Sequence, residues 1–215
     1  MKSLKLFALV LAGLLAGQAH AGDAAAGEAK AAPCAACHGP DGNSPAADFP
    51  KIAGQGEKYF IKQLQDYKSG ARENAIMAAQ VAGLSEQDMK DLAAFYAQQP
   101  VEGGAANADL VEAGERLFRG GNMNSGVAAC SGCHGPAGEG IAAAGFPALA
   151  GQHARYTEQQ LRSFRSAGRD DLGASAYRRN DTAGDDLGMM QSIAAKMTDR
   201  EIQAVASFIA GLSAE

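Results

Sequence analysis

The fold of this chain is decided by the stretch Cys34-Ala35-Ala36-Cys37-His38-Gly39-Pro40, which returns as Cys130-Ser131-Gly132-Cys133-His134-Gly135-Pro136. Both copies have the form CxxCH, and together they use all 4 cysteines of the 215-residue chain. Two thiols at this spacing, followed directly by histidine, are typical of covalent attachment of a c-type haem. The thiols become thioethers to the porphyrin, and the histidine becomes an axial ligand of the iron. The sequence therefore predicts two covalently bound haem c groups, held by Cys34, Cys37, Cys130 and Cys133, with His38 and His134 as iron ligands.

Other uses of four cysteines fit this spacing less well. A zinc ribbon places its two CxxC pairs about 15 to 20 residues apart, whereas 92 residues separate Cys37 from Cys130. A redox dithiol needs no histidine at the same place in both copies, and it lies in a βαβ context that is missing here. Two such short disulfide loops would cross-link very little of the chain, although an exported protein would tolerate them.

The similarity between the two copies extends beyond the cysteines. The motif Phe-Pro-x-x-Ala-Gly-Gln begins at Phe49 and again, 97 positions later, at Phe146. Nearer the C-terminus the offset grows to 113, so the second copy has 16 additional residues between Arg169 and Gly188. Because the order of the matches is kept throughout, the chain is a tandem duplication.

A segment with one proline, two glycines and no apolar period separates the copies, at about residues 98–108. We therefore predict domains over 22–100 and 101–215. Apolar residues recur at helical spacing in each, and neither shows the alternation of a strand, so an all-α fold is expected. Capping-box patterns at Ser85 and Thr198 predict the start of the last helix in each domain.

The first 21 residues read as a signal peptide. Two lysines precede an apolar run over 6–16, and Ala19-His20-Ala21 has the small-x-small pattern of a cleavage site. The run of 11 residues is too short to span a bilayer. We expect cleavage near Ala21 and export to a bacterial periplasm. The formal charge of −5, from 24 acidic and 19 basic residues, argues against a nucleic-acid partner.

Methionine is the candidate for the second axial ligand of each iron. The repeat register pairs Met77 with Met190, each seven residues before a matched position and expected in an extended segment. Met189 is one residue away and remains the rival of Met190. The remaining histidine of the exported chain is His153, which aligns with Gly56 and is expected at the surface or in the core. A thioether ligand raises the reduction potential of a haem, which suits transfer of single electrons.

These residues resemble a known family. Cys34–His38, Pro50, Met77 and the C-terminal helix are similar to a class I cytochrome c. The tandem pair, each with Phe-Pro-x-x-Ala-Gly-Gln, resembles the dihaem cytochrome c4 family over essentially the whole exported chain. The resemblance implies two all-α class I cytochrome c domains related by a pseudo-twofold axis, with haem propionates meeting near the interface.

The resemblance also implies a hydrogen bond behind each histidine. The carbonyls of Pro50 and Pro147 would accept the Nδ1–H groups of His38 and His134, fixing the orientation of each ring. The arginines of the second domain would be charge partners of the propionates or simply a solvated basic face, and the candidates are Arg155, Arg162 and Arg165.

The function implied by the resemblance is that of a periplasmic one-electron carrier in respiration, not an enzyme. It would exchange electrons with redox proteins such as a respiratory complex and deliver them toward a haem–copper terminal oxidase. Two alternatives stay open: a dihaem peroxidase, which needs one open or labile iron position, and a cytochrome subunit held in a dehydrogenase complex. The matched pair Met77 and Met190 argues against the peroxidase. Peripheral association with the membrane is a further alternative for the exported protein, and the 169–188 insertion is expected to alter the approach to the second methionine.

Overall fold

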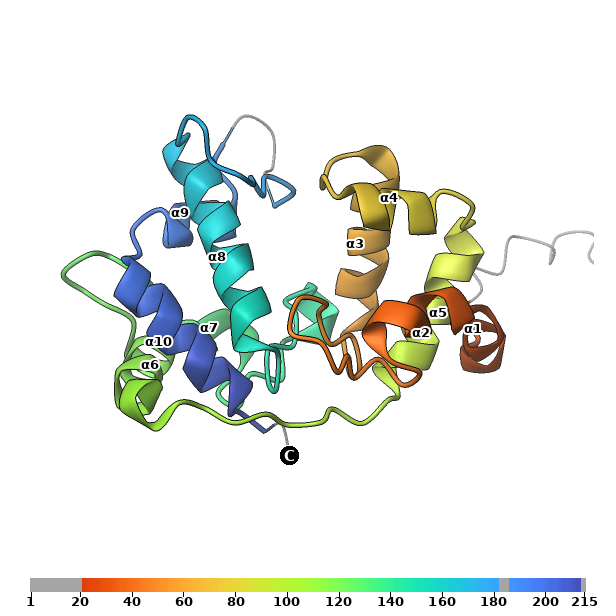
Figure 1. Cartoon of the computed structure of the whole chain (residues 1–215), viewed down its shortest axis with the longest axis horizontal. Coiled ribbons are helices and arrows are strands. Elements are labelled where there is room, and N and C mark those ends of the chain that lie inside the picture. The colour runs from red at the N-terminus through yellow and green to blue at the C-terminus, as the bar shows by residue number, and fades with distance from the viewer. Residues whose placement is uncertain (1–20, 182–185, 214–215) are drawn as a thin grey trace, which may run out of the picture.

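The chain folds into two helical lobes in a computed structural model, which describes residues 21–181 and 186–213 (Figure 1). The helices of the first lobe are α1 (Ala24–Lys30), α2 (Ala32–His38), α3 (Glu57–Ser69), α4 (Ala75–Val81) and α5 (Glu86–Ala97). Those of the second are α6 (Ala108–Gly120), α7 (Ser131–His134), the short 3-10 helix η1 (Ala142–Ala144), α8 (Ala154–Arg169), α9 (Met189–Ala194) and α10 (Asp199–Ala210). Within these described residues there is no strand beyond two isolated bridges, so the predicted all-α class is confirmed.

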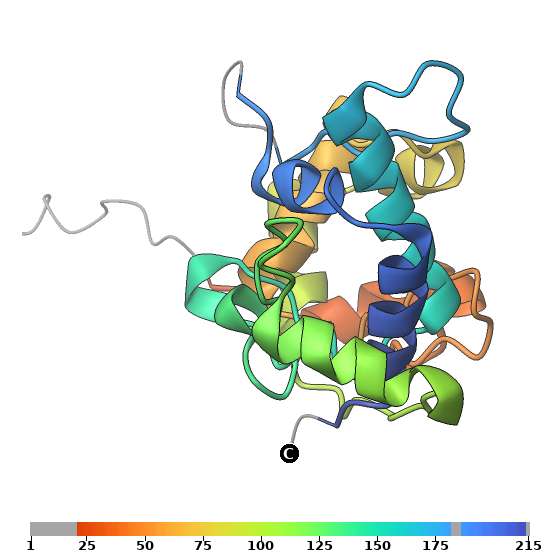
Figure 2. The same ribbon diagram turned by 90° about the vertical axis from the view of Figure 1, so that its left-hand side faces the viewer.

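The first and last helices of each lobe cross at a glycine. Helix α1 packs on α5, and α6 packs on α10 in the same way; the second pair faces the viewer in Figure 2. A Cβ atom at Gly27 would lie 2.0 Å from the carbonyl oxygen of Asp91, and one at Gly114 would lie 2.2 Å from that of Ala204. Only glycine permits such close approach of two helix backbones. Both halves of the duplication therefore use the same helix crossing.

Each lobe has its own apolar core beneath the last helix. The first core includes Phe60, Leu64, Met89, Leu92 and Tyr96. The second includes Phe118, Phe164, Met197, Ile202 and Val205.

Both predicted capping boxes are present, because Ser85 and Thr198 each exchange hydrogen bonds with the carboxylate-bearing residue three positions on. These caps satisfy amide groups that the first turn of a helix cannot satisfy itself.

The methionine segments differ from the expectation. Met77 lies inside helix α4 and Met190 inside helix α9, so the predicted extended conformation is wrong at both positions. These helices have only 7 and 6 residues, too few for a 3.6-residue period to show in the sequence. Helices of this length depend on capping and on tertiary packing rather than on propensity.

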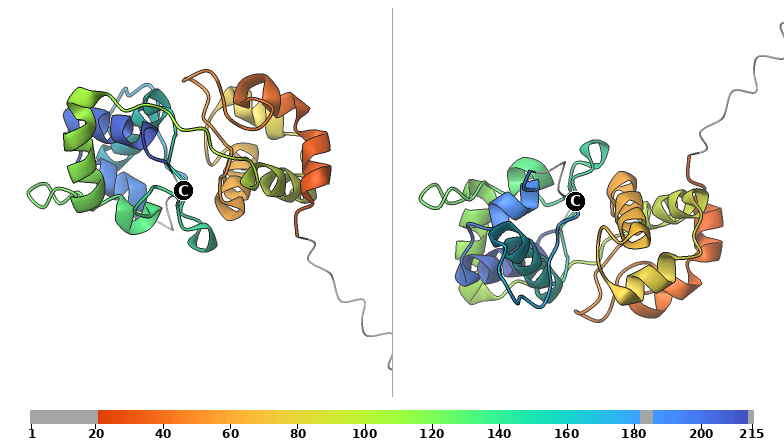
Figure 3. Two further views of the ribbon diagram at one scale, coloured as in Figure 1. Left: turned by 90° about the horizontal axis from the view of Figure 1, so that it is seen from below. Right: turned by 90° about the horizontal axis from the view of Figure 1, so that it is seen from above.

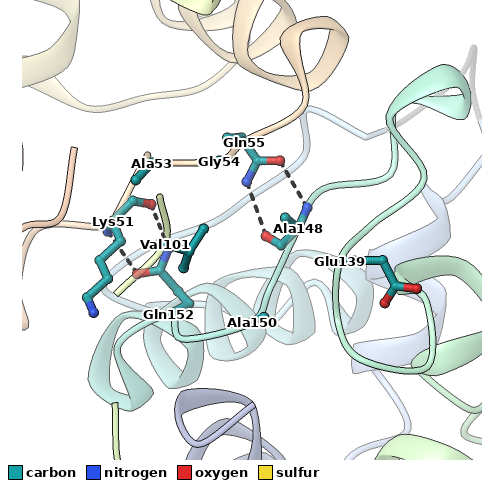
Figure 4. Close-up of a pocket in the computed structure, with 9 residues that line it drawn as sticks. All are labelled: Lys51, Ala53, Gly54, Gln55, Val101, Glu139, Ala148, Ala150 and Gln152. Carbon is teal, nitrogen blue, oxygen red and sulfur yellow. Dashed lines mark hydrogen bonds between the residues drawn. The ribbon is translucent and has the colours of Figure 1, made fainter. Parts of the chain in front are cut away.

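The two lobes meet through a reciprocal pair of glutamines (Figure 4). Gln55 donates to the carbonyl of Ala148 at 3.1 Å and accepts from its N–H at 2.9 Å. Gln152 donates to the carbonyl of Lys51 at 2.8 Å and accepts from its N–H at 3.0 Å. Gln152 lies 97 positions after Gln55, and Ala148 lies 97 positions after Lys51. The two contacts are therefore related by the pseudo-twofold axis of the duplication.

A second reciprocal contact lies between α3 and α8. Arg72 of the first lobe donates to the hydroxyl of Tyr156 at 3.0 Å, and Arg178 of the second donates to Tyr59 at 2.9 Å. Both arginines are buried. The guanidinium groups also share two glutamines, one from each lobe: Gln63 and Gln160. The non-helical connection after α5 crosses from one lobe to the other on a single side of this interface (Figure 3).

Candidate haem-binding sites

Each CxxCH segment ends a helix on its histidine. His38 is the last residue of α2 and His134 the last residue of α7. The glycines that follow, Gly39 and Gly135, have φ of 81° and 80°, a conformation that glycine adopts without strain. The chain therefore turns away directly after each histidine, and both histidines are buried where their helices end.

Both imidazoles are fixed through one nitrogen. Nδ1 of His38 lies 2.8 Å from the carbonyl oxygen of Pro50, and Nδ1 of His134 lies 2.9 Å from that of Pro147. These are the contacts that the resemblance implies. Burial lowers the pKa of both imidazoles, and the hydrogen bond to the proline carbonyl opposes this only in part. A neutral ring that donates Nδ1–H to a carbonyl leaves the lone pair of Nε2 for a metal ion.

The thiols do not have the environment of a redox-active pair. All four cysteines are free and half-buried. Burial raises the pKa of Cys34, and it raises the pKa of Cys130 to about 11. A reactive dithiol needs a lowered thiol pKa, so the environment of these two residues is the opposite of a thioredoxin-like site.

The donors in each lobe suit an iron whose other ligands come from a porphyrin. In the part of the chain that the structure describes, no three histidine, cysteine or acidic side chains converge to hold a metal ion. Each lobe instead offers one oriented histidine and one partly buried methionine at the edge of its core, whereas Met89 and Met197 lie fully inside the cores. Met77 and Cys34 both contact the first core, and Met190 and Cys130 both contact the second. The residues present therefore fit one haem c in each lobe.

Met189 and Met190 have different surroundings. The side chain of Met189 is 49% exposed, whereas Met190 is partly buried against the second core. The register of the repeat and this packing favour the same residue, Met190, as the counterpart of Met77.

His153 contributes to the lobe interface. Its Nε2 lies 2.8 Å from the carbonyl oxygen of Ser44 in the other lobe. The sequence alone left its place open between surface and core, because it has no counterpart in the first copy.

The arginines singled out from the sequence pair with carboxylates. Arg162 and Arg165 both contact Asp199, and Arg155 contacts Asp48 across the interface. The buried arginines at the interface between the lobes are Arg72 and Arg178, and the sequence did not predict either of them. A better signal would have been their position near the repeated Gln63 and Gln160, although neither arginine falls in the repeat register.

A family model for cytochrome c matches residues 24–99 and 111–213, one match in each lobe. Cytochrome c4 of Pseudomonas aeruginosa is 51% identical over 208 residues, which is 96% of this chain and 98% of that protein. The chain belongs to the cytochrome c4 family. The crystal structure of reduced recombinant cytochrome c4 from Pseudomonas stutzeri matches with a TM-score of 0.79 and 45% identity, over 90% of this chain and 100% of that one.

As a member of this family, the chain is a dihaem electron-transfer protein whose two CxxCH motifs bind haem c. The predicted family, fold class and cofactors are confirmed. A further relative is the thiosulfate dehydrogenase electron acceptor of Thiomonas intermedia, 38% identical over 84% of this chain and 78% of that protein. The described helices include none with the length and apolar character of a membrane span.

Proposed function

We propose that this protein carries single electrons in the periplasm between a respiratory donor and a haem–copper terminal oxidase. His38 and Met77 would be the axial ligands in the first lobe, and His134 and Met190 those in the second. The observation that carries the proposal is that each lobe has one oriented histidine and one partly buried methionine at the edge of its core. When bound, each haem supplies an iron that alternates between the ferric and ferrous states.

The side chains would keep each iron closed to outside molecules. The carbonyls of Pro50 and Pro147 accept from Nδ1 of the two histidines, and Met77 on α4 and Met190 on α9 would supply the second ligand of each iron. A thioether prefers ferrous iron and raises the reduction potential. An iron with both of these ligands would have no open position for peroxide, which argues against a peroxidase.

Export rests on the predicted signal peptide ending near Ala21, of which residues 1–20 lie outside the described residues. The domain limits 22–100 and 101–215 likewise stay a prediction.

A second candidate donor is a thiosulfate dehydrogenase, because a relative at 38% identity is named for accepting electrons from one. Stopped-flow reduction by a thiosulfate dehydrogenase and by a quinol-oxidising complex would distinguish the two donors.

The test of the proposal is a spectroelectrochemical titration of the purified holoprotein with near-infrared detection of iron–sulfur charge transfer. We expect two haems, both with a thioether band. Met77→Ala and Met190→Ala should each remove one band and lower one potential, while Met189→Ala serves as the matched control and changes neither. Rapid CO binding to one native ferrous haem, or peroxide turnover, would instead favour a peroxidase.

A further inference from the structure

The backbone N–H groups of the two methionines are held by different acceptors. The N–H of Met77 donates to the side-chain oxygen of Asn74 at 3.0 Å. The N–H of Met190 donates to a carboxylate oxygen of Asp181 at 2.6 Å. The first acceptor is a neutral amide three residues before its methionine. The second is a carboxylate nine residues before its methionine, and it lies within the insertion of the second repeat.

Asp181 closes the N-terminal end of helix α9. The residue at the start of that helix, Gly188, has no side chain to cap it. Asp181 takes over this role and also accepts from the backbone N–H of Gln191 at 3.3 Å and from its side-chain amide at 2.7 Å. Gln191 is itself buried. One carboxylate therefore fixes two successive residues of the helix that carries Met190.

The approach of Asp181 requires the glycine beside it. A Cβ atom at Gly188 would lie 2.2 Å from a carboxylate oxygen of Asp181. The side chain thus fills the space that any other residue at position 188 would occupy. The hydrogen bonds that the carboxylate of Asp181 accepts come from the amide N–H groups of Met190 and Gln191.

We propose that Asp181 is the positioning residue of the second haem site, which holds the Met190 helix and would place a negative charge near the iron bound there. This rests on the proposed function, in which Met190 is the axial ligand. A nearby carboxylate stabilises ferric over ferrous iron by Coulomb attraction, and so it lowers the reduction potential of that haem. The first lobe performs the same positioning with the neutral Asn74. The insertion therefore gives the two haems different electrostatic surroundings at equivalent points.

A reciprocal exchange of the two caps tests this in the holoprotein. Asp181→Asn keeps an acceptor oxygen and removes the charge, while Asn74→Asp adds a charge at a position where aspartate caps a helix equally well. Spectroelectrochemistry should show Asp181→Asn raising the potential of the second haem alone, with a severalfold rise in its reduced-to-oxidised ratio at a fixed ambient potential. Asn74→Asp should lower the potential of the first haem alone. Both variants should keep their thioether bands.

A third variant separates positioning from charge. Asp181→Ala removes the hydrogen bonds as well, so the thioether band of the second haem should weaken or become pH-sensitive while that of the first stays intact. The Met190→Ala variant identifies the wave of the second haem, and its failure to change either haem would overturn the ligand assignment itself. If Met190 is the ligand, but Asp181→Asn moves neither potential and Asp181→Ala keeps a native band, the role of Asp181 is overturned.

Discussion

The two lobes make the same interlobe contact from different places in the chain. Arg72 follows Gln63 by nine residues, in the short connection between α3 and α4, whereas Arg178 follows Gln160 by eighteen, inside the insertion. Each guanidinium nevertheless reaches the tyrosine of the opposite lobe. The duplication thus places the same chemical group at the same point in space, although the sequence positions do not correspond.

The insertion also attaches the second lobe to the first beyond Arg178. Asn180 donates to Gln63 at 3.0 Å and accepts at its backbone carbonyl from Lys62 at 2.6 Å. Among the described residues, the connection that carries Arg72 in the first lobe makes no further contacts of this kind with the second lobe. The interface is therefore symmetric in its arginines and glutamines, and asymmetric in the segment that carries Arg178, Asn180 and Asp181.

Arg178→Gln should have the largest effect on stability. It removes a buried charged donor and leaves the hydroxyl of Tyr59 and the amide of Gln63 without that partner. We expect the free energy of unfolding of the holoprotein to fall by about 3 kcal/mol in guanidinium titrations. Arg72→Gln should cost a similar amount.

The double arginine variant sharpens this comparison. Because the two guanidinium groups share Gln63 and Gln160, the double change should cost less than the sum of the single ones. The control is Arg116→Gln, an exposed arginine paired with Glu112 on the surface of α6, which should change stability by less than about 0.5 kcal/mol. If either single variant keeps the free energy of unfolding of the unchanged protein, the reciprocal arginine contact does not stabilise the fold.

Gln55→Ala and Gln152→Ala come next. Each removes two interlobe hydrogen bonds to backbone groups, so we expect a loss of about 2 kcal/mol. Hydrogen exchange can assign the loss to one place in each variant. The amide of Ala148 should lose protection in Gln55→Ala, and the amide of Lys51 should lose it in Gln152→Ala. If each variant instead loses protection equally at both amides, the loss of either glutamine separates the lobes as a whole.

The sequence was sufficient for features that are local or periodic. Two CxxCH motifs, the capping boxes at Ser85 and Thr198 and the helical periods are such features, and the all-α class follows from them. Helices α4 and α9 are too short to produce a period, and so their methionines were expected in extended chain. Arg178 and Asp181 act through contacts between distant segments inside an insertion, where the repeat offers no register to compare. The function of such residues becomes visible only when the fold brings their partners to them.

The smallest difference between the lobes is the pH at which their capping boxes lose stability in acid. Hydrogen bonds from the Ser85 hydroxyl and N–H, with a contribution from Lys30, lower the pKa of Asp88 to about 2. Burial opposes the shift at Glu201, but hydrogen bonds from Thr198 and Asn122 still hold its pKa below the ordinary value. Carboxylates with depressed folded pKa values stabilise the fold above their unfolded values, about 3.9 for aspartate and 4.3 for glutamate, and lose this contribution as pH falls.

The start of α5 should therefore lose stability between about pH 4 and pH 2, and the start of α10 should begin to lose it just below about pH 4.3. Asp88→Asn should flatten the acid dependence of exchange at the first turn of α5 and leave α10 unchanged. Glu201→Gln should do the reverse, because glutamine still completes a capping box but does not titrate. Amide exchange resolved by helix, recorded from pH 5 to pH 2, measures both. An unchanged acid slope in both variants would assign the acid sensitivity to other carboxylates, such as Asp91, whose pKa is also lowered by its hydrogen bond from the N–H of Asp23.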